Sequence, residues 1–284
     1  MRDADGYFNI IISGGCSGGF NMSADLSLLE GYRTAGDISE RPTLRLYYFA
    51  PPALSLGFFQ KDKDRNSKNI SDGIIAKAKD KGYDIISRPT GGRAVLHKNE
   101  ITYSLTASYR KGIFAGELLE TYKKAGEFLN LFFIKLGLNP DNNFSSDKTG
   151  KIKNSFNPAF KKNNFNCFLK AHPYEITFGG RKICGNSQRR SDNAFLQHGS
   201  IYVDYNPAEH IELFEDGDLE ANAEYFKNIT GIKQEMERAK IDYVPRYLGF
   251  ESLSGIIANS FSDAYGLKPK LAYLPITGLR AEGI

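Results

Sequence analysis

The residue best suited to carry out a chemical reaction is Cys167, one of three cysteines in a chain of 284 residues. Lys170 and His172 follow it closely, and Lys182 lies farther along the chain. A thiol beside cationic side chains has a lowered pKa, and its thiolate attacks acyl groups well. An isolated cysteine is also commonly a small buried core residue. The pattern therefore indicates a candidate acyl-accepting nucleophile, with a packing role as the alternative.

A second stretch that could form a functional site runs from Arg88 to His97, with the sequence RPTGGRAVLH, and continues through EITYS at Glu100–Ser104. The paired glycines allow a ligand to approach the main chain closely, and one arginine on each side supplies positive charge. The apolar runs around the motif predict a strand, a glycine turn, a strand and then a further strand. The plainer interpretation is a basic β-hairpin around a glycine turn.

A third stretch is the pair Gly179-Gly180, which separates the alternating runs 173–178 and 181–185. Two glycines between such runs are a strong signal of a β-hairpin. The return strand carries Lys182, which is either a surface lysine on an edge hairpin or a cation that polarises an acyl carbonyl. His97 and His198 are further candidates for acid–base chemistry, although histidines are often hydrogen-bonded core residues.

Three strings carry a family resemblance: RPTGGRAVLH with EITYS, the earlier pattern YxF…P…LSLGxxQ, and NCF…PYEI…GGRKIxGxSQRR…LQHGSI. They resemble the lipoate–protein ligase, octanoyltransferase and biotin–protein ligase superfamily, and most closely its cofactor-independent octanoyltransferases of the Gram-positive type. The similarity runs from about Asn21 to Tyr202 and is weak beyond. ATP-using lipoate ligases usually carry a serine-glycine-glycine motif and an Asn-Leu-Asn stretch, where this chain has Thr90 and Ile101–Tyr103.

The resemblance implies a biotin/lipoate protein ligase-like α/β fold, with a mixed β-sheet flanked by helices in a single catalytic domain over residues 1–284. It implies transfer of an octanoyl group from octanoyl-acyl carrier protein to a lysine of a lipoyl domain, such as glycine-cleavage H protein or a 2-oxoacid dehydrogenase E2 subunit. It also implies a Cys167 thioester, an oxyanion stabilised by Lys182, and no cofactor or metal, because the donor thioester is already activated. The residues expected around the acyl chain are Ser55, Gln60, Arg88, Thr90, Gly91, Gly92, Arg93, Ala94, His97 and Gly185, with an ordinary exposed amide as the alternative for Gln60.

Other functions fit parts of the pattern. An ATP-dependent lipoate–protein ligase would form an acyl-adenylate and would not need Cys167. An amidotransferase that passes octanoyl or lipoyl groups between two protein lysines would also use a cysteine. A non-catalytic binding module is disfavoured because Cys167 and Lys182 are both present. Cys184 occupies a position that is usually apolar in the family, so it is either a packed small residue or a second thiol near the site.

Composition narrows the classes further. The formal net charge of +4 is compatible with an acidic protein partner and does not require nucleic acid. Three widely spaced cysteines without a CxxC pair argue against a disulfide framework and a structural zinc site, and favour a reduced cytosolic compartment. No apolar run approaches the ~20 residues of a membrane span, and the acidic start MRDAD is unlike a signal or transit peptide.

The elements that must position these residues follow from hydrophobic periodicity. Strands are expected at 7–12, 43–49, 53–57, 195–203 and 269–274, helices at 21–32, 74–81, 117–136, 221–229 and 250–265, and loops at 13–19 and 61–71. Asn21 is expected to open its helix, as an N-cap or as part of the family's opening motif with Met22 and Asp25. Residues 207–284 are expected to be mainly helical. The Asn-, Ser- and Lys-rich stretch 141–164 predicts a mobile loop, either a solvated face or a docking patch for an acidic carrier protein.

Overall fold

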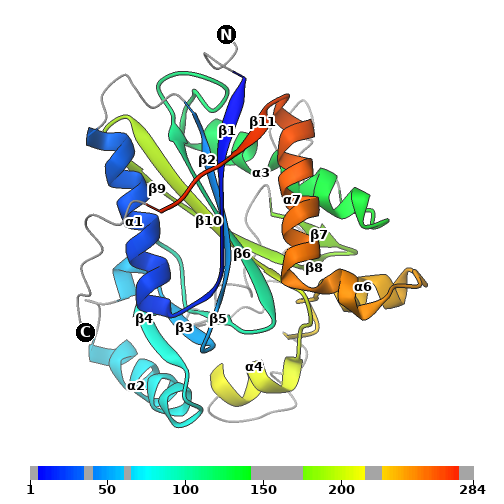
Figure 1. Ribbon diagram of the computed structural model, residues 1–284. Helices are drawn as coiled ribbons and strands as arrows, with labels where there is room; N and C mark the ends of the chain where they lie inside the picture. The colour runs from blue at the N-terminus through cyan, green and yellow to red at the C-terminus, as the bar shows by residue number, and fades with distance from the viewer. Residues whose placement is uncertain (1–5, 35–40, 61–64, 142–174, 215–225, 275–284) are drawn as a thin grey trace, which may run out of the picture.

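The computed structural model describes residues 6–34, 41–60, 65–141, 175–214 and 226–274, around a central six-stranded sheet with the order β11-β1-β2-β6-β10-β9 (Figure 1). β1 pairs in parallel with both β11 and β2, whereas β2, β6, β10 and β9 pair antiparallel in turn. The sheet is therefore mixed, as the sequence predicts. Its strands are β1 (Tyr7–Cys16), β2 (Thr43–Phe49), β6 (Glu100–Ser108), β9 (Cys184–Ser191), β10 (Ala194–Tyr202) and β11 (Lys268–Leu271).

Helices cover both faces of this sheet, with α1 (Gly18–Thr34) on one side and α3 (Leu118–Lys135) and α7 (Phe250–Tyr265) on the other (Figure 1). Side chains of a strand alternate between the two faces. Leu44, Leu46 and Tyr103 belong to the large apolar core with α3 and α7, whereas Arg45 and Ser104 point to α1 and hydrogen-bond with it. The sheet thus has one apolar face and one face with buried polar groups, and the latter holds the site.

A smaller sheet with the order β4-β3-β5 lies beside the larger one, with α2 (Arg65–Asp80) and α4 (Pro207–Phe214) next to it (Figure 1). Its strands are β3 (Ala53–Leu56), β4 (Asp84–Ser87) and β5 (Val95–His97). β4 runs parallel to β3 and β5 runs antiparallel to it. β3 therefore separates the two strands that flank residues 88–94, which we call the glycine motif. The predicted order of strand, turn, strand and strand is confirmed, but the interpretation as a simple β-hairpin is wrong, because the 88–94 loop crosses the end of β3.

The predicted hairpin at the second glycine pair is confirmed by β7 (Thr177–Phe178) and β8 (Arg181–Lys182). Gly179 and Gly180 have φ values of 53° and 78°, which side chains with a Cβ disfavour. The carboxylate of Asp141 accepts hydrogen bonds from both of their amides and from Thr177 Oγ1. The chain on either side of the region 142–174 is therefore attached to this hairpin.

Several element boundaries differ from the predictions. β1 extends to Cys16 through an irregularity between Ile12 and Gly14, so most of the expected glycine loop is strand. α1 then begins at Gly18, and the Ser17 hydroxyl accepts a hydrogen bond from the Phe20 backbone amide. The expected N-cap Asn21 therefore lies inside the helix. α2 begins at Arg65, within the expected charged loop.

Most of the other predicted helices and strands agree closely with the structure, but the described end of the predicted 221–229 helix is a turn that leads to Ile229, which forms a bridge with Lys182. α3 ends just before Gly137, which has a φ of 80° and follows the C-cap residue, as expected. Only Asp141 of the predicted 141–164 loop is described, and the N-terminal part of the predicted 221–229 helix also lies outside the described residues. The C-terminal region contributes α4, α6 (Ile232–Arg238), α7 and the edge strand β11. Short 3₁₀ turns occupy Phe58–Gln60 and Pro245–Leu248.

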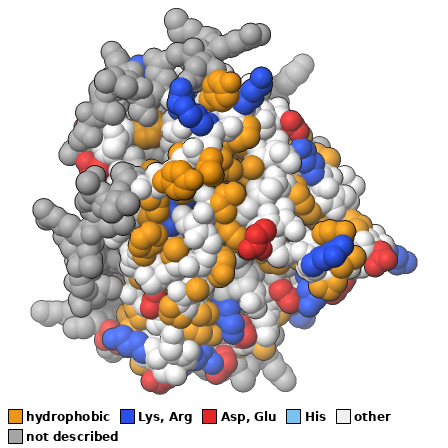
Figure 2. Space-filling view, in the orientation of Figure 1, with side chains coloured by type: hydrophobic (Ala, Val, Ile, Leu, Met, Phe, Trp, Pro, Cys, Tyr) orange, Lys and Arg blue, Asp and Glu red, His pale blue; other side chains and the backbone are white. Residues whose placement is uncertain are grey.

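One face of the molecule combines hydrophobic and charged side chains, with the hydrophobic ones gathered over its upper and central part (Figure 2). Exposed apolar side chains include Ile12 of β1 and Leu271 of the edge strand β11, which are 50% and 61% exposed. Among the described helices, none has the length and apolar character required to span a bilayer.

Replacing Gly57 by Ala tests how closely β3 approaches the glycine motif. A Cβ at Gly57 would lie 1.9 Å from the Gly92 carbonyl oxygen, and we expect Gly57→Ala to destabilise the protein by about 1–3 kcal/mol, the usual cost of overpacking. Gly255→Ala is the matched control, because nothing lies within 4 Å of the new Cβ inside α7 and alanine favours a helix interior by ~0.5–1 kcal/mol. Urea unfolding measures both variants, and equal stability would contradict the close approach.

Candidate active site

A cavity of about 410 Å³, part of it open to solvent, lies where the polar face of the large sheet meets α1 and the small sheet. The lining combines apolar side chains with hydroxyl, imidazole, guanidinium and amide groups from both sheets. The residues are Met22, Tyr47, Phe49, Ser55, Arg88, Val95, His97, Thr102, Gly185, Asn186, Ser187, His198, Gly199 and Ser200.

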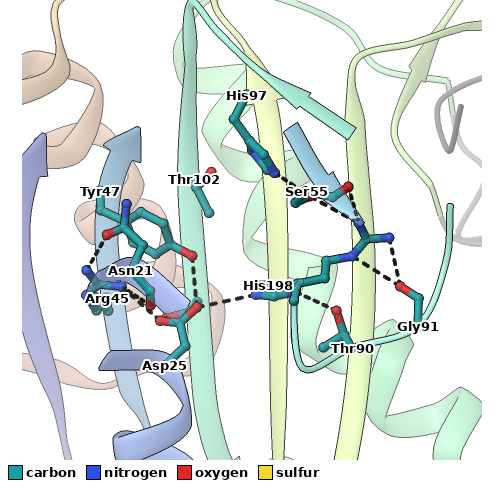
Figure 3. A network of polar contacts seen from close by, with 12 residues as sticks. Asn21, Asp25, Arg45, Tyr47, Ser55, Thr90, Gly91, His97, Thr102 and His198 are labelled. Carbon is teal, nitrogen blue, oxygen red and sulfur yellow. Dashed lines mark hydrogen bonds and ion pairs between the residues drawn. The ribbon is translucent and has the colours of Figure 1, made fainter. Parts of the chain in front are cut away.

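A fully buried ion pair lies behind this cavity (Figure 3). Arg45 Nη1 lies 2.9 Å from Asp25 Oδ1, and neither side chain is exposed. Ser104 also donates to Oδ1, while Tyr47 and His198 contact Oδ2. Burial by itself raises the pKa of Asp25, but the His198 hydrogen bond and the Arg45 charge outweigh it, so the pKa lies below its ordinary value. Asp25 is therefore a carboxylate at neutral pH, with its acceptor sites filled.

His198 joins this ion pair to the glycine motif (Figure 3). Its Nδ1 lies 3.3 Å from Asp25 Oδ2, and its Nε2 lies 2.6 Å from Thr90 Oγ1. Because an ionised carboxylate can only accept, Nδ1 carries the proton. Neutral His198 then has an unprotonated Nε2, which accepts the hydrogen of the Thr90 hydroxyl. The ring is held on both sides while it lines the cavity.

Arg88 holds the glycine motif from inside. Its guanidinium donates to the carbonyl oxygens of Gly91, Arg93 and Ser55. The side chain is buried, so its charge is directed at the loop's own carbonyl groups. Ser187 Oγ donates to Gly91 O from β9. The loop is therefore fixed by side chains from both sheets.

A second hydroxyl–imidazole pair lines the cavity at Ser55 and His97 (Figure 3). Arg88 donates to Ser55 Oγ, and Ser55 Oγ lies 2.9 Å from His97 Nε2. The direction of the bond between Ser55 Oγ and His97 Nε2 depends on the His97 tautomer, because a serine oxygen can accept from arginine and from imidazole together. Burial lowers the pKa of His97, although the nearby Glu100 carboxylate acts in the opposite direction. His97 Nδ1 has no hydrogen-bond partner among the described residues, and its contact with Glu100 is 3.9 Å.

Lys182 is neither exposed nor part of the cavity lining. Its ammonium lies 2.7 Å from Glu175 Oε1, and both side chains are 2% exposed. The interpretation of Lys182 as a surface lysine is therefore wrong. Cys184, two residues on, is buried, and burial raises the pKa of its thiol. Of the two alternatives for Cys184, a packed small residue or a second thiol near the site, the structure favours the packed residue.

The structure brings some of the expected acyl-site residues together and leaves others apart. Ser55, Arg88, His97 and Gly185 line the cavity. Thr90 and Gly91 contact the lining residues His198 and Ser187.

Four expected residues lie next to this group without lining the cavity. Gly92 packs against Gly57, Arg93 offers its carbonyl oxygen to Arg88, and Ala94 is buried in a separate apolar cluster. Gln60 Oε1 accepts the Gly57 amide within its own turn. Cys167, Lys170 and His172 lie outside the described residues.

The sequence reasoning missed the polar network itself. Asp25, expected as part of the opening motif of its helix, is fully buried. A usable signal is present in the strands, because polar residues recur at every second position of β2 and β6, at 43 and 45 and at 102, 104 and 106. Such alternation places polar side chains on one sheet face, and a buried helix carboxylate is the partner that they require.

Comparison with known proteins places the chain in a family. Residues 17–244 match the family model described as the lipoyl protein ligase A/B catalytic domain. Octanoyltransferase LipM of Geobacillus kaustophilus is 32% identical over 265 residues, covering 90% of this chain and 89% of that protein. Octanoyltransferase LipM of Bacillus subtilis is 35% identical over 211 residues, covering 73% and 69%. That of Kyrpidia tusciae is 34% identical over 201 residues, covering 70% and 67%.

Solved structures share the fold at low sequence identity. A lipoate-protein ligase A bound with ATP has a TM-score of 0.63 at 14% identity, covering 94% of this chain and 90% of that one. A bi-partite lipoate protein ligase from Thermoplasma acidophilum, described with its E2 lipoyl domain, also has a TM-score of 0.63 at 14% identity, covering 94% and 88%. These two structures support the fold alone.

Replacing Asp25 by Asn tests the buried ion pair. The buried Arg45 charge would lose its counter-ion, so we expect Asp25→Asn to cost about 3–5 kcal/mol at neutral pH. The pKa of Asp25 is depressed in the folded state, so its stabilising contribution is complete above the ordinary carboxyl pKa. It is lost as the pH falls below that value and through the depressed one.

The matched control is Asp263→Asn, which removes the partner of Lys135 from a surface pair with side chains 61% and 35% exposed. Exposed pairs contribute ~0–1 kcal/mol. Urea unfolding at several pH values compares both variants with the wild type. A small, pH-independent effect of Asp25→Asn would contradict this account of the pair.

Proposed function

The chain belongs to the lipoyl protein ligase A/B catalytic-domain family and is an acyltransferase, and from that premise we propose that it transfers octanoyl from octanoyl-acyl carrier protein to a lipoyl-domain lysine. The observation that carries the proposal is the similarity to octanoyltransferase LipM over about nine tenths of both chains. Octanoyl transfer in protein lipoylation follows from that similarity. The carrier-protein donor and the route through a cysteine thioester are the parts that we propose.

The cavity supports an acyl substrate. Met22, Phe49 and Val95 supply apolar lining, which suits a hydrocarbon chain. The same lining also carries polar groups, which suit the carbonyl end of an acyl substrate. They belong to Ser55, Arg88, His97 and His198. We propose that the acyl chain occupies this cavity, with its carbonyl near the glycine motif. Backbone amides around the paired glycines and Gly185 are the proposed oxyanion donors.

The proposed nucleophile is Cys167. Its thiolate attacks the carbonyl carbon of the donor thioester, so that a new carbon–sulfur bond forms and the carrier's thiol leaves with a proton. The acceptor's lysine amine then attacks the acyl-enzyme, so that a carbon–nitrogen bond forms and the Cys167 thiol is released. Because the donor is already a thioester, the transfer needs neither a nucleotide nor a metal.

The described ends of the region that carries Cys167 support this assignment. Asp141, on one side, hydrogen-bonds to the β7–β8 turn, and Glu175, on the other, forms an ion pair with Lys182 of the same hairpin. Cys167 precedes Glu175 by eight residues in the sequence. We propose that Lys182, which Glu175 holds and which shortly precedes Gly185 of the cavity lining in the chain, polarises the acyl carbonyl.

A transfer assay without nucleotide tests the donor and the acceptor. We expect purified enzyme, octanoyl-carrier protein and a lipoyl domain to give octanoylated lipoyl domain, at a rate unchanged by ATP and magnesium. Mass spectrometry of the acceptor measures the product. Transfer only with free octanoate or lipoate and ATP would favour a lipoate–protein ligase. Transfer only from an octanoylated H protein would favour an amidotransferase.

Mass spectrometry of the enzyme tests the nucleophile. After incubation with octanoyl-carrier protein alone, the wild type is expected to gain one octanoyl mass that hydroxylamine removes, because thioesters are cleaved by it. Cys167→Ser should gain no hydroxylamine-labile mass. Cys16→Ser is the control and should load normally. Among the described residues, the Cys16 thiol hydrogen-bonds to the nearby Ser13 carbonyl oxygen. Normal loading of Cys167→Ser would exclude Cys167 as the acceptor.

A further inference from the structure

Four groups form a continuous hydrogen-bonded line from the protein interior to the glycine motif (Figure 3). Arg45 contacts Asp25 at 2.9 Å, Asp25 contacts His198 Nδ1 at 3.3 Å, and His198 Nε2 contacts Thr90 Oγ1 at 2.6 Å. They come from β2, α1, β10 and the loop after β4. The imidazole lines the cavity, and the hydroxyl belongs to the loop whose Arg88 also lines it.

The neighbours of His198 determine its tautomer. Arg45 only donates and Asp25 only accepts, so His198 Nδ1 donates, and in the neutral ring the bare Nε2 accepts from Thr90. The positive charge of Arg45 already compensates the negative charge of Asp25. The carboxylate therefore orients the ring and selects its tautomer. A bare imidazole nitrogen bonded to a hydroxyl is an arrangement suited to a general base.

We propose that Asp25, His198 and Thr90 form a proton relay that removes the proton of the acceptor's lysine amine during acyl transfer. The proposal rests on the proposed function in one respect, namely that an amine displaces a thiol from an acyl thioester. It does not depend on which sulfur carries the acyl group.

The step balances as follows. The amine nitrogen attacks the thioester carbonyl carbon, so that the carbon–nitrogen bond forms and the carbon–sulfur bond breaks. The nitrogen loses a proton to Thr90 Oγ1 while this hydroxyl gives its own proton to His198 Nε2. The imidazolium, stabilised by Asp25, returns a proton through Thr90 to the departing thiolate. Thr90 is the proposed catalytic residue of the relay, and His198 and Asp25 act through it.

The second imidazole lacks one part of this arrangement. His97 Nε2 also hydrogen-bonds with a hydroxyl, that of Ser55, but its Nδ1 has no hydrogen-bond partner among the described residues. The Ser55 hydroxyl is also engaged by Arg88. Of the two, the His198 line is the one with a continuous path from an ionised carboxylate to a hydroxyl of the glycine motif.

Any pH dependence assigned to His198 has to account for the charged groups around it. Asp25 of α1 contacts the ring directly, and His97 of β5 senses its charge. The other titratable or charged groups of the same network are Arg45 and Tyr47 on β2, Arg88 after β4 and Glu100 on β6. Arginine and a tyrosine whose pKa burial raises well above its ordinary value do not titrate near neutrality.

The test separates acyl loading from acyl transfer in three threonine variants of the full chain. Enzyme is incubated with octanoyl-carrier protein, and a lipoyl domain is then added in a single turnover. We expect Thr90→Val to load normally and to transfer about 10²- to 10⁴-fold more slowly, the usual contribution of general acid–base catalysis. Thr90→Ser, which keeps a hydroxyl, should recover most of the transfer rate.

Thr106→Val is the matched control. Thr106 is buried on β6, and its hydroxyl has no hydrogen-bond partner in the described part of the chain, so its loss should change neither step. Thermal unfolding of all variants identifies any loss that is due to folding. Equal transfer by Thr90→Val and wild type, or a Thr90→Val defect that Thr90→Ser shares, would overturn the relay.

A pH profile gives the readout that a purely structural role would leave unchanged. The wild-type transfer rate should rise with pH as an imidazole loses its proton, and His198→Gln should lose this inflection. An unaltered inflection in His198→Gln would overturn the relay. Absence of any acyl-enzyme in the wild type would instead count against the proposed thioester route, so the two failures are distinguishable.

Discussion

The buried ion pair between Asp25 and Arg45 is the interaction on which the rest of the site depends. Placing two unexposed charges between a helix and a sheet is costly unless each is paired and hydrogen-bonded. Here the Asp25 carboxylate accepts further hydrogen bonds from Tyr47, Ser104 and His198. This requirement explains why one face of the central sheet is polar beneath α1, while the opposite face is filled by aromatic and aliphatic side chains.

The same network positions a loop that lies at the junction of two sheets. From the large sheet, His198 and Ser187 hydrogen-bond to Thr90 and Gly91. From within the loop, Arg88 donates to the carbonyl oxygens of Gly91 and Arg93. Arginine is suited to this task, because its planar group donates in several directions at once. The glycine motif is thus held by hydrogen bonds from the large sheet and from Arg88, and the Arg88 guanidinium faces the loop's own carbonyl groups.

Proteins described as a lipoate-protein ligase and as octanoyltransferases are both similar to this chain. A lipoate-protein ligase A bound with ATP and this chain have the same fold at 14% sequence identity, whereas the octanoyltransferases are similar over most of their length at more than 30% identity. Fold alone does not distinguish adenylate chemistry from thioester chemistry. The distinction between them therefore depends on individual residues, and Cys167, Lys182 and the His198 line are the ones that this chain offers.

Local rules were sufficient for much of the fold. Gly179-Gly180 with alternating flanks specified a hairpin, because only a two-residue turn with positive φ joins such strands closely. The apolar spacing of α3 specified a long core helix ending before Gly137. Local rules were insufficient for the glycine segment at 13–19, where pairing of β1 with β2 extends the strand to Cys16, because strand pairing is a long-range interaction.

The sequence by itself therefore determined the mixed α/β class, the hairpin that carries Lys182 and the motifs of the family. Only the tertiary structure decided that β3 separates β4 from β5, that Lys182 is buried against Glu175, and that Asp25 meets Arg45 and His198. The reason is physical. Periodicity reports which way a side chain points relative to its own element, whereas the partner of a buried charge comes from an element that lies far away in the chain.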